Sequence, residues 1–521
     1  MPEPEHRRRR LEIAALLCGA LAFPAGPLLA EDVGTVGPDV TVYSLSGFSN
    51  YGAVGGVRAY ALGTTSCNIG DVPVNWCDNG GGCSGLASNQ HPVIAQSVYR
   101  LKNGRFEQLG MSWLKHGFLS TNTPAGSSCV GPGGQQCTSP PRGGDELGIG
   151  CTDTYGSSLN GSWSWLGPRS EVNATTGLFP FPATNGPESQ VIDQRIQIRE
   201  SDLDATMNPG ALYWGEGHYV SDNDALAGNG FNNASYRPLT VGAAPTYNLT
   251  FGGSTIREKS AMDAWVTTDP AVEFIAVDFS SGGLPAERFE VARKVTEPSP
   301  GLFHYEYAIR NMNSDRAARR FSISFDEAIA FSNVGFKDVD HHSGEPYDPT
   351  DWLIEPTPGV DTVAWSGETF ATDPDANALR WGTMYNFWFD ADAGPDQIAI
   401  HRLELFKPGT PAHVDFWLGA SATFGLDVTV DGDGSVTSDP VGIDCPDSAC
   451  SHAFLVGTPV ELTAQPAAGW QFLGWSGDCT GTGTCDVTMD GVHSVTATFD
   501  TMPFLDGFES ADTSAWSVTV P

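Results

Sequence analysis

Apolar and polar residues alternate along most of the chain between about residues 40 and 420. In residues 93–118, two alternating runs flank Asn103–Gly104, the dipeptide most typical of a two-residue type I′ hairpin turn. Further runs follow from about residue 271: VEFIAVDF, ERFEVARKV, FHYEYAIRN, RRFSISF, TVAWS, LRWGTMYNFWFDA and QIAIHRLELF. Strands at this spacing, separated by Gly, Pro, Asp and Asn turns, favour antiparallel β-sandwich domains. A short helix is predicted at residues 256–266, where Asp269–Pro270 would end it soon after.

The amino-terminal residues have the order of a secretory signal peptide. Arginines at 7–10 precede an apolar run at 13–22, and Pro24 breaks this run before Ala30. This order predicts that residues 1–30 are a signal peptide and that the mature protein is secreted or held at the bacterial cell surface. No later segment has the about 18 uninterrupted apolar residues of a membrane helix, so no membrane span is expected.

The cysteines fall into two groups. Of the 11 cysteines, Cys18 lies in the predicted signal, and the other ten are Cys67, Cys77, Cys83, Cys129, Cys137, Cys151, Cys445, Cys450, Cys479 and Cys485. An even, clustered set in an exported protein predicts disulfides. Proximity in sequence favours the local pairs Cys77–Cys83 and Cys129–Cys137, which would leave Cys67 with Cys151. Six cysteines allow fifteen connectivities, so other pairings stay open.

A long motif lies between residues 426 and 499, with GSVTSDPVGIDC, GTPVELTAQPAAGWQFLGWSGDC and the closing SVTATF. This stretch closely resembles the divergent internalin-B-type bacterial repeat, which implies a compact β unit used as a stalk or adhesive module in exported surface proteins. The residues agree with this resemblance, because VELTAQP and SVTATF alternate as strands and Trp470, Phe472 and Trp475 would supply a small core. So small a domain needs covalent staples, which Cys445–Cys450 and Cys479–Cys485 would provide.

The remainder, with stretches such as GHYVSDNDALAGNGFNNASYRPLTV and YEYAIRNMNSDRA, resembles a family of uncharacterised secreted bacterial proteins, and this resemblance implies no activity. Together the patterns predict an all-β multidomain protein with antiparallel β-sandwich-like domains and a small C-terminal β repeat module. The predicted parts are a signal peptide at 1–30, a disulfide-stapled β-rich region at 31–245, a β-sandwich-like domain at 246–423, a repeat domain at 424–500 and a tail at 501–521.

Charge and composition restrict the partners. The formal net charge of −35 opposes binding to nucleic acid, which is itself an anion. A charged fraction of 17% with 40% hydrophobic residues excludes a globally disordered chain. The expected partners are a glycan, the cell envelope or an extracellular polymer.

Histidines in polar, glycine-bounded contexts are the candidate metal ligands: His91, His116, His218, His341 and His342. Imidazoles bind copper, zinc or iron, so a transition-metal site is conceivable in the first region. His341 and His342 on one strand would point to opposite faces. Neither HExxH nor H-x-H occurs, and ordinary hydrogen-bonded histidines are the alternative interpretation.

Two turns offer oxygen ligands for Ca²⁺, at 222–224 (Asp-Asn-Asp) and at 431–434 (Asp-Gly-Asp-Gly), although neither completes an EF-hand loop. Trp163, Trp165 and Tyr155 are candidate ligand-binding residues. The two tryptophans would share one face of an extended segment, where their rings could stack on a ligand.

The leading hypothesis is a secreted or cell-surface modular protein with a binding or adhesion role. The alternative is a secreted metal-dependent enzyme with its site in the N-terminal region. A serine nucleophile is not predicted, because Asn160 stands where the G-x-S-x-G motif requires its second glycine. Whether the chain is an enzyme stays open at this point.

Overall fold

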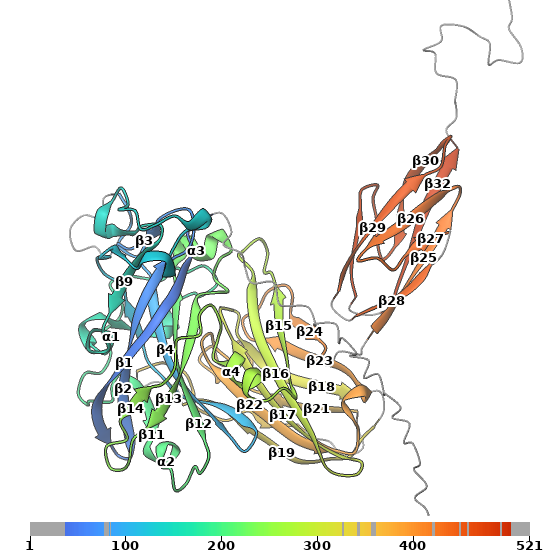
Figure 1. Cartoon of the computed structure of the whole chain (residues 1–521). Helices are drawn as coiled ribbons and strands as arrows, with labels where there is room; N and C mark the ends of the chain where they lie inside the picture. The colour runs from blue at the N-terminus through green and yellow to red at the C-terminus, as the bar shows by residue number, and fades with distance from the viewer. Residues whose placement is uncertain are drawn as a thin grey trace, which may run out of the picture. The chain divides into compact units, whose positions relative to one another are not determined.

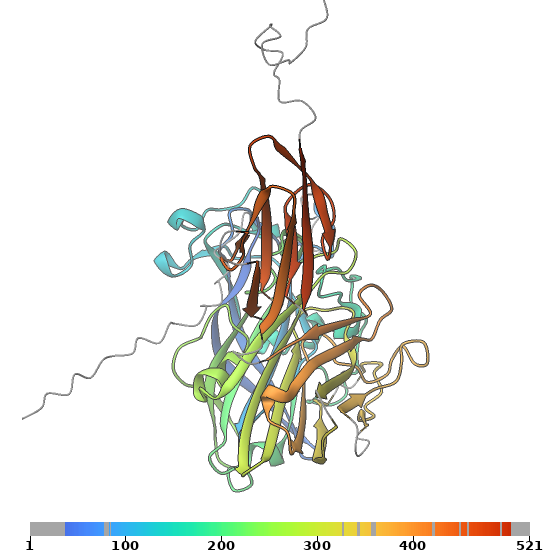
Figure 2. The same cartoon turned by 90° about the vertical axis from the view of Figure 1, so that its right-hand side faces the viewer.

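The computed structural model describes residues 37–77, 83, 85–325, 328–340, 344–355, 361–418, 423–446, 450–455, 458–489 and 492–501. Strands dominate both views, and helices are few and short (Figure 1, Figure 2). The sheets are almost entirely antiparallel, which confirms the predicted all-β multidomain fold. The predicted signal peptide and C-terminal tail lie outside the described residues, and the predicted domain boundaries stay predictions.

The first region contains two main sheets and a short two-stranded ladder. The first sheet has the order β1 (Val40–Val54), β2 (Val57–Asn68), β9 (Cys151–Tyr155) and β7 (Thr123–Pro124), with β11 (Ile196–Arg199) also on β2. The second has the order β10 (Leu166–Gly167), β6 (Leu114–His116), β4 (Val93–Lys102), β12 (Leu212–Val220), β13 (Ala234–Val241) and β14 (Leu249–Phe251), with β5 (Arg105–Met111) also on β4. The short ladder pairs β3 (Val74–Asn75) with β8 (Glu146–Leu147).

Apolar side chains from both main sheets meet in one core. Tyr60 and Leu62 come from β2, Ile94 and Val98 from β4, and Tyr219 from β12; all five are fully buried. Short helices lie in the connections: α1 (Ser157–Asn160), α2 (Glu200–Leu203) and α3 (Asp222–Ala227). This packing positions the strands that carry His116, His218 and Tyr155 and the connections that carry His91, Trp163 and Trp165.

The predicted hairpin is present between β4 and β5. Asn103 and Gly104 both have positive φ, 53° and 85°, as a type I′ turn requires. The β5 strand also contacts the middle region, because Arg105 forms an ion pair with Glu306 at 2.7 Å. The main-chain oxygen of Phe106 accepts a hydrogen bond from the side chain of Asn386 at 2.7 Å.

The middle region is built from two five-stranded sheets. One has the order β15 (Val272–Phe279), β16 (Glu287–Ser299), β17 (Leu302–Asn311), β22 (Met384–Ala391) and β19 (Phe331–Lys337). The other has the order β20 (Leu353–Ile354), β21 (Thr362–Ser366), β18 (Ala318–Phe325), β23 (Ile398–Leu405) and β24 (His413–Phe416). A largely aromatic core that includes Tyr307, Phe321, Trp365, Phe387 and Phe389 draws on both sheets, as expected of a sandwich.

The predicted helix begins later than expected. Helix α4 spans Met262–Thr268, whereas the sequence predicts a start at residue 256. Ile256 instead forms an isolated bridge with Tyr236 of β13, with main-chain hydrogen bonds of 3.0 and 2.8 Å. Ile256 is thus paired with a strand, and the helix begins only after residues 257–261.

The carboxyl-terminal module contains two four-stranded sheets. One has the order β28 (Ser451–Leu455), β25 (Thr423–Asp431), β32 (His493–Thr501) and β30 (Trp470–Gly477), and its β25–β32 pair is parallel. The other has the order β27 (Asp444–Cys445), β26 (Gly434–Asp439), β29 (Pro459–Pro466) and β31 (Cys485–Thr488). Trp475 is buried in the core of this module, with Trp470 and Phe472 packed against it, as predicted.

The structure pairs all ten described cysteines. The disulfides are Cys67–Cys129, Cys77–Cys83, Cys137–Cys151, Cys445–Cys450 and Cys479–Cys485. The predicted pairs Cys77–Cys83, Cys445–Cys450 and Cys479–Cys485 are confirmed. The predicted pairs Cys129–Cys137 and Cys67–Cys151 are wrong.

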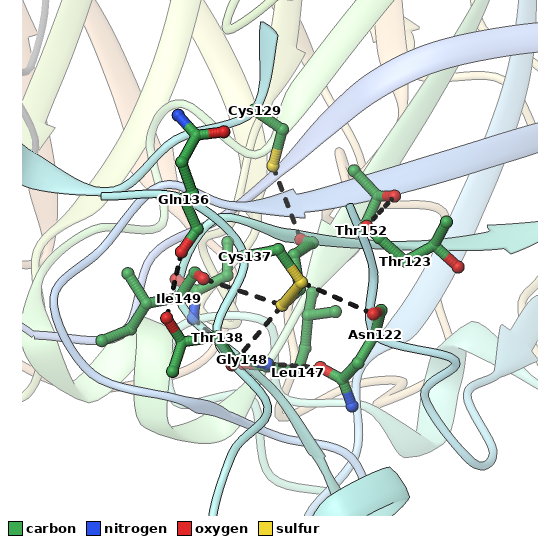
Figure 3. The surroundings of a disulfide bond; sticks show 12 residues. Asn122, Thr123, Cys129, Gln136, Cys137, Thr138, Leu147, Gly148, Ile149 and Thr152 are labelled. Atoms are coloured by element: carbon green, nitrogen blue, oxygen red, sulfur yellow. Dashed lines mark hydrogen bonds between the residues drawn. A yellow bond between two sulfur atoms is a disulfide. The ribbon is translucent and has the colours of Figure 1, made fainter. Parts of the chain in front are cut away.

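The strand register explains this correction. Cys67 of β2 lies opposite Thr152 of β9, so the adjacent Cys151 points to the other face of the sheet. Cys67 therefore meets Cys129 on one face, and Cys151 meets Cys137 on the other. Figure 3 shows Cys137 beside Asn122, whose side-chain oxygen accepts a hydrogen bond from the Gly148 main-chain N–H at 2.7 Å.

Candidate functional site

His91 and His116 form a hydrogen-bonded pair. Nδ1 of His91 donates to the main-chain oxygen of Cys77 at 2.6 Å, so Nε2 of the same ring accepts. The donor to Nε2 is Nδ1 of His116, at 2.9 Å. Phe179 and Phe181 contact both rings. Burial lowers the pKa of His116 well below its ordinary value, and the charges of His91 and Lys115 lower it further.

This geometry places a proton between the two rings. Two imidazole nitrogens that bind one tetrahedral zinc at about 2.0–2.1 Å lie roughly 3.3 Å apart, with both lone pairs directed at the metal. In the observed pair one of the two nitrogens carries the hydrogen. The pair is therefore a neutral structural contact in this arrangement.

His218 lies in a different environment, and its Nδ1 is 3.5 Å from the guanidinium of Arg310. Burial lowers the pKa of His218, and the charges of Arg310 and Arg169 lower it further. His341 and His342 lie outside the described residues. In the part of the chain that the structure describes, no group of three or more His, Cys, Asp or Glu side chains has the spacing of a metal site. The transition-metal hypothesis stays a prediction.

A buried charge cluster joins the first and middle regions. Arg310 of β17 binds Glu216 of β12 and Glu290 of β16, each at 2.9 Å, and the three side chains are 1%, 3% and 8% exposed. Oε2 of Glu216 accepts the main-chain N–H of Ala261 at 2.7 Å. Burial raises the pKa of Glu216, and Arg310 offsets part of this rise. Because Arg310 and a main-chain N–H occupy both Glu216 oxygens, this cluster connects strands rather than supplying a free acid or base.

Tyr155 is buried, with 2% of its surface exposed. Its hydroxyl accepts hydrogen bonds from Nε1 of Trp76 at 2.9 Å and from the Phe118 main-chain N–H at 2.8 Å. It also donates to the Phe118 main-chain oxygen at 2.5 Å. The ring is therefore not exposed for stacking on a ligand, in contrast to the expectation from sequence.

Trp165 belongs to a cage around a buried lysine. The ammonium of Lys115 lies 4.4 Å from the ring centre of Phe118, 4.9 Å from that of Tyr155 and 5.3 Å from that of Trp165. The same ammonium donates a short hydrogen bond to the main-chain oxygen of His116. Cation–π contacts of this kind stabilise a desolvated cation. Sequence reasoning missed this cage, since Tyr155 and Trp165 lie 40 and 50 positions after Lys115 along the chain.

Trp163 and Trp165 do not share one face, because residues 163–165 form a 3₁₀ turn instead of the predicted extended segment. Trp163 lies in another stack, in which the Arg195 guanidinium is 4.4 Å from the Trp163 ring centre and 3.8 Å from that of Tyr51. Val191, 38% exposed, lies beside this stack, because its main-chain oxygen accepts a hydrogen bond from Arg195 at 2.7 Å. We call Tyr51, Trp163 and Val191, around Arg195, the Tyr51–Trp163 surface.

The two predicted calcium turns differ in the structure. The residues at 431–433 end β25 and turn into β26, and they are exposed to solvent. Asp222 and Asp224 lie in α3 and are both buried. The carboxylate of Asp222 accepts hydrogen bonds from the amides of Asn75 and Gln90. The carboxylate of Asp224 instead accepts from the Val40 main-chain N–H.

Comparison with known protein families matches residues 425–503 to the divergent InlB B-repeat domain. A search of curated proteins finds no match to the chain. In the described residues, every helix is too short or too polar to cross a membrane. The resemblance of residues 40–420 to secreted bacterial proteins stays a prediction. Over its carboxyl-terminal module, the chain is therefore similar to the divergent InlB B-repeat domain.

Proposed function

We propose that this chain is an exported bacterial protein whose large β part binds an extracellular ligand, while the repeat module serves as a spacer or adhesive unit. The observation that carries the proposal is the pairing of all ten described cysteines in five disulfides. Disulfides persist in oxidising compartments and are rare in the cytosol. The match to a B-repeat module and the signal-like amino terminus support the same location.

The location is tested by expressing the full chain in a bacterial host and fractionating the cells. We expect the protein in the periplasm, on the surface or in the medium, with a new amino terminus close to residue 31. Peptide mapping without reductant should recover the five disulfide-linked peptide pairs. Cytoplasmic protein that retains residues 1–30 and has free thiols would overturn the proposal.

The Tyr51–Trp163 surface supports a glycan as the ligand. Aromatic rings with one apolar face and a polar edge bind partners that combine C–H groups with hydroxyls. Arg195 covers one face of each ring and holds both rings in place. Because Trp163 is only half-buried, part of its surface is available to a ligand.

This ligand class is tested by binding the mature protein to an array of bacterial envelope polysaccharides. Trp163→Ala should weaken binding at least about tenfold, which corresponds to the roughly 1.4 kcal/mol of one well-placed ring contact. Trp417→Ala is the matched control, because Trp417 is also half-buried and its indole N–H also donates to a main-chain oxygen. Equal binding by both variants, with circular dichroism spectra like the wild type, would contradict the glycan assignment.

A further inference from the structure

Two buried arginines line one small cavity where the first and middle regions meet. Arg169 follows β10 and Arg380 precedes β22, and the two residues are 4% and 8% exposed. The cavity has a volume of about 10 Å³. Its lining residues are Met111, Arg169, Glu345, Tyr347, Arg380, Trp381 and Thr383.

Each guanidinium has a buried nitrogen without a hydrogen-bond partner. Nε and Nη2 of Arg169 donate to the main-chain oxygens of Ser112 and Gln96 at 2.7 and 3.4 Å, whereas Nη1 has no partner. Nη2 of Arg380 donates to two main-chain oxygens at 3.0 and 2.9 Å, whereas Nε has no partner. Buried donors without a partner are rare in folded proteins, so two of them in the lining of one cavity require an explanation.

The position of Nη1 of Arg169 is fixed by the residues that line the cavity. This nitrogen lies against Gly382, which stands between the lining residues Trp381 and Thr383, and a Cβ at Gly382 would overlap it. The indole N–H of Trp381 donates to the Arg169 main-chain oxygen at 3.3 Å. The unpartnered end of Arg169 is therefore held at the part of the cavity wall that residues 381–383 form.

The cavity lining carries more positive than negative charge. Arg169 and Arg380 are its cations, and Glu345 is its anion. The two oxygens of Glu345 accept the main-chain N–H groups of Arg169 and Ser170 at 2.7 and 3.2 Å. Main-chain oxygens are neutral acceptors, so the hydrogen bonds of the two guanidiniums add no second negative charge. One positive charge among the lining side chains is left in excess.

This excess charge is unfavourable in a buried position. Burial lowers the pKa of Arg169 to about 10, the charge of Glu345 opposes this change, and the charge of Arg310 adds to it. Burying a charged group is costly unless an opposite charge and hydrogen bonds compensate. A monovalent anion in the cavity would supply both the charge and an acceptor for the unpartnered nitrogens.

We propose that this cavity binds a chloride ion between the guanidiniums of Arg169 and Arg380. Guanidinium N–H groups form their strongest hydrogen bonds with anions. One water molecule needs about 10–15 Å³ by the measure used for this cavity, so the cavity accommodates a monatomic group and excludes sulfate or phosphate. Chloride is monatomic, carries one charge and is abundant outside cells.

A bound chloride would connect the first and middle regions. Arg169 lies between β10 and β11 of the first region, whereas Arg380 lies between β21 and β22 of the middle region. The unfolded chain does not hold these two arginines together, so chloride binding would stabilise the folded state. This role is independent of the proposed ligand-binding function.

The test uses the purified full chain in sodium gluconate, whose large anion the cavity excludes, with sodium chloride added at constant ionic strength. Bound chloride broadens the ³⁵Cl NMR line. We expect this broadening for the wild type, together with a rise of about 3 °C in the first thermal transition. Sodium bromide, which also supplies a monatomic anion, should displace the chloride and remove the broadening, whereas sodium sulfate should not.

Arg380→Met should weaken chloride binding at least about tenfold, because it removes one of the two guanidiniums. Arg316→Met is the matched control. Arg316 is also 8% exposed and also donates to a main-chain oxygen, that of Lys407 at 3.0 Å, but it is not among the residues that line the cavity. This control should change the affinity less than about threefold.

Glu345→Gln covers the case in which Arg380→Met fails to fold. Glutamine keeps an oxygen for the main-chain N–H groups and removes the negative charge from the lining, so chloride binding should tighten at least about threefold. The proposal is overturned if the wild type shows no ³⁵Cl broadening that bromide removes, which would leave water as the occupant. It is also overturned if sulfate competes as well as bromide, or if Glu345→Gln does not tighten binding.

Discussion

Strand periodicity predicts which residues form strands, but it does not predict the contacts of single buried polar residues. The sequence predicts that Trp165 and His116 face a ligand. Instead, Trp165 is one of the aromatic rings that enclose the ammonium of Lys115. The side chain of His116 binds another histidine instead of facing a ligand. In both cases most of the surrounding residues, such as Tyr155 and His91, are remote in sequence, so the neighbours along the chain do not indicate the environment.

The environment of one residue, Asp338, predicts that the stability of the fold depends on pH. Burial raises the pKa of Asp338 to about 6, the hydrogen bond from Asn377 opposes this rise, and the charges of Asp351 and Asp340 add to it. Because the folded-state pKa lies above the unfolded value of 3.8, the folded state binds the proton more tightly. The stabilisation from this group is complete below about pH 4 and is lost as the pH rises through about 6.

Asp338→Asn should remove this dependence. Relative to the variant, the wild type should lose about 2 kcal/mol of unfolding free energy between pH 4 and pH 7, as measured by urea unfolding at several pH values. Asp340→Asn is the comparison variant: Asp340 is 69% exposed in its ion pair with Arg199 and adds less to the shift than burial does, so this variant should keep most of the wild-type slope. If both variants keep the wild-type slope over this interval, Asp338 is not the titrating group.

At the scale of elements, the bounds of some strands match the predicted runs closely. Strands β15 and β21 coincide with the predicted runs VEFIAVDF and TVAWS. Strand β22 begins at Met384, five residues after the start of the predicted run LRWGTMYNFWFDA. The difference arises because Leu379 forms only an isolated bridge with Ala318, and a turn follows before β22.

The loop lengths that two of the disulfides close predict how much stability each disulfide contributes. Cys67–Cys129 joins residues 62 positions apart, whereas Cys77–Cys83 joins residues 6 positions apart. Closing a longer loop removes more entropy from the unfolded chain. Replacing Cys67 and Cys129 by serine should therefore cost about 4 kcal/mol in urea unfolding, and replacing Cys77 and Cys83 about 2 kcal/mol. A larger loss from the short loop would contradict this interpretation.

At the scale of the whole molecule, the first and middle regions share buried charge and apolar surface. Phe106, Trp214 and Tyr236 of the first region pack in one cluster with Trp265 and Ala308. Arg310, Glu216 and Glu290 lie beside this cluster. The two regions therefore depend on each other for stability, even though each has its own pair of sheets.

Arg310→Met tests this dependence. The substitution leaves Glu216 and Glu290 buried without their cation, so urea unfolding should show a loss of about 3–5 kcal/mol. Arg320→Met removes a partly exposed arginine with two carboxylate partners and should cost less than about 1 kcal/mol. Losses of equal size would show that the buried cluster contributes no more than a surface ion pair.

The sequence by itself determined the β class, the Asn103–Gly104 hairpin and the repeat module, because these follow from local alternation, turn chemistry and a contiguous motif. Only the tertiary structure decided which cysteines meet, which aromatic rings are exposed and which acidic residues gather. The Val40 N–H and the Asp224 carboxylate that accepts it lie 184 residues apart. Contacts over such separations depend on which strands pair and in which register, and neighbouring residues along the chain do not specify either.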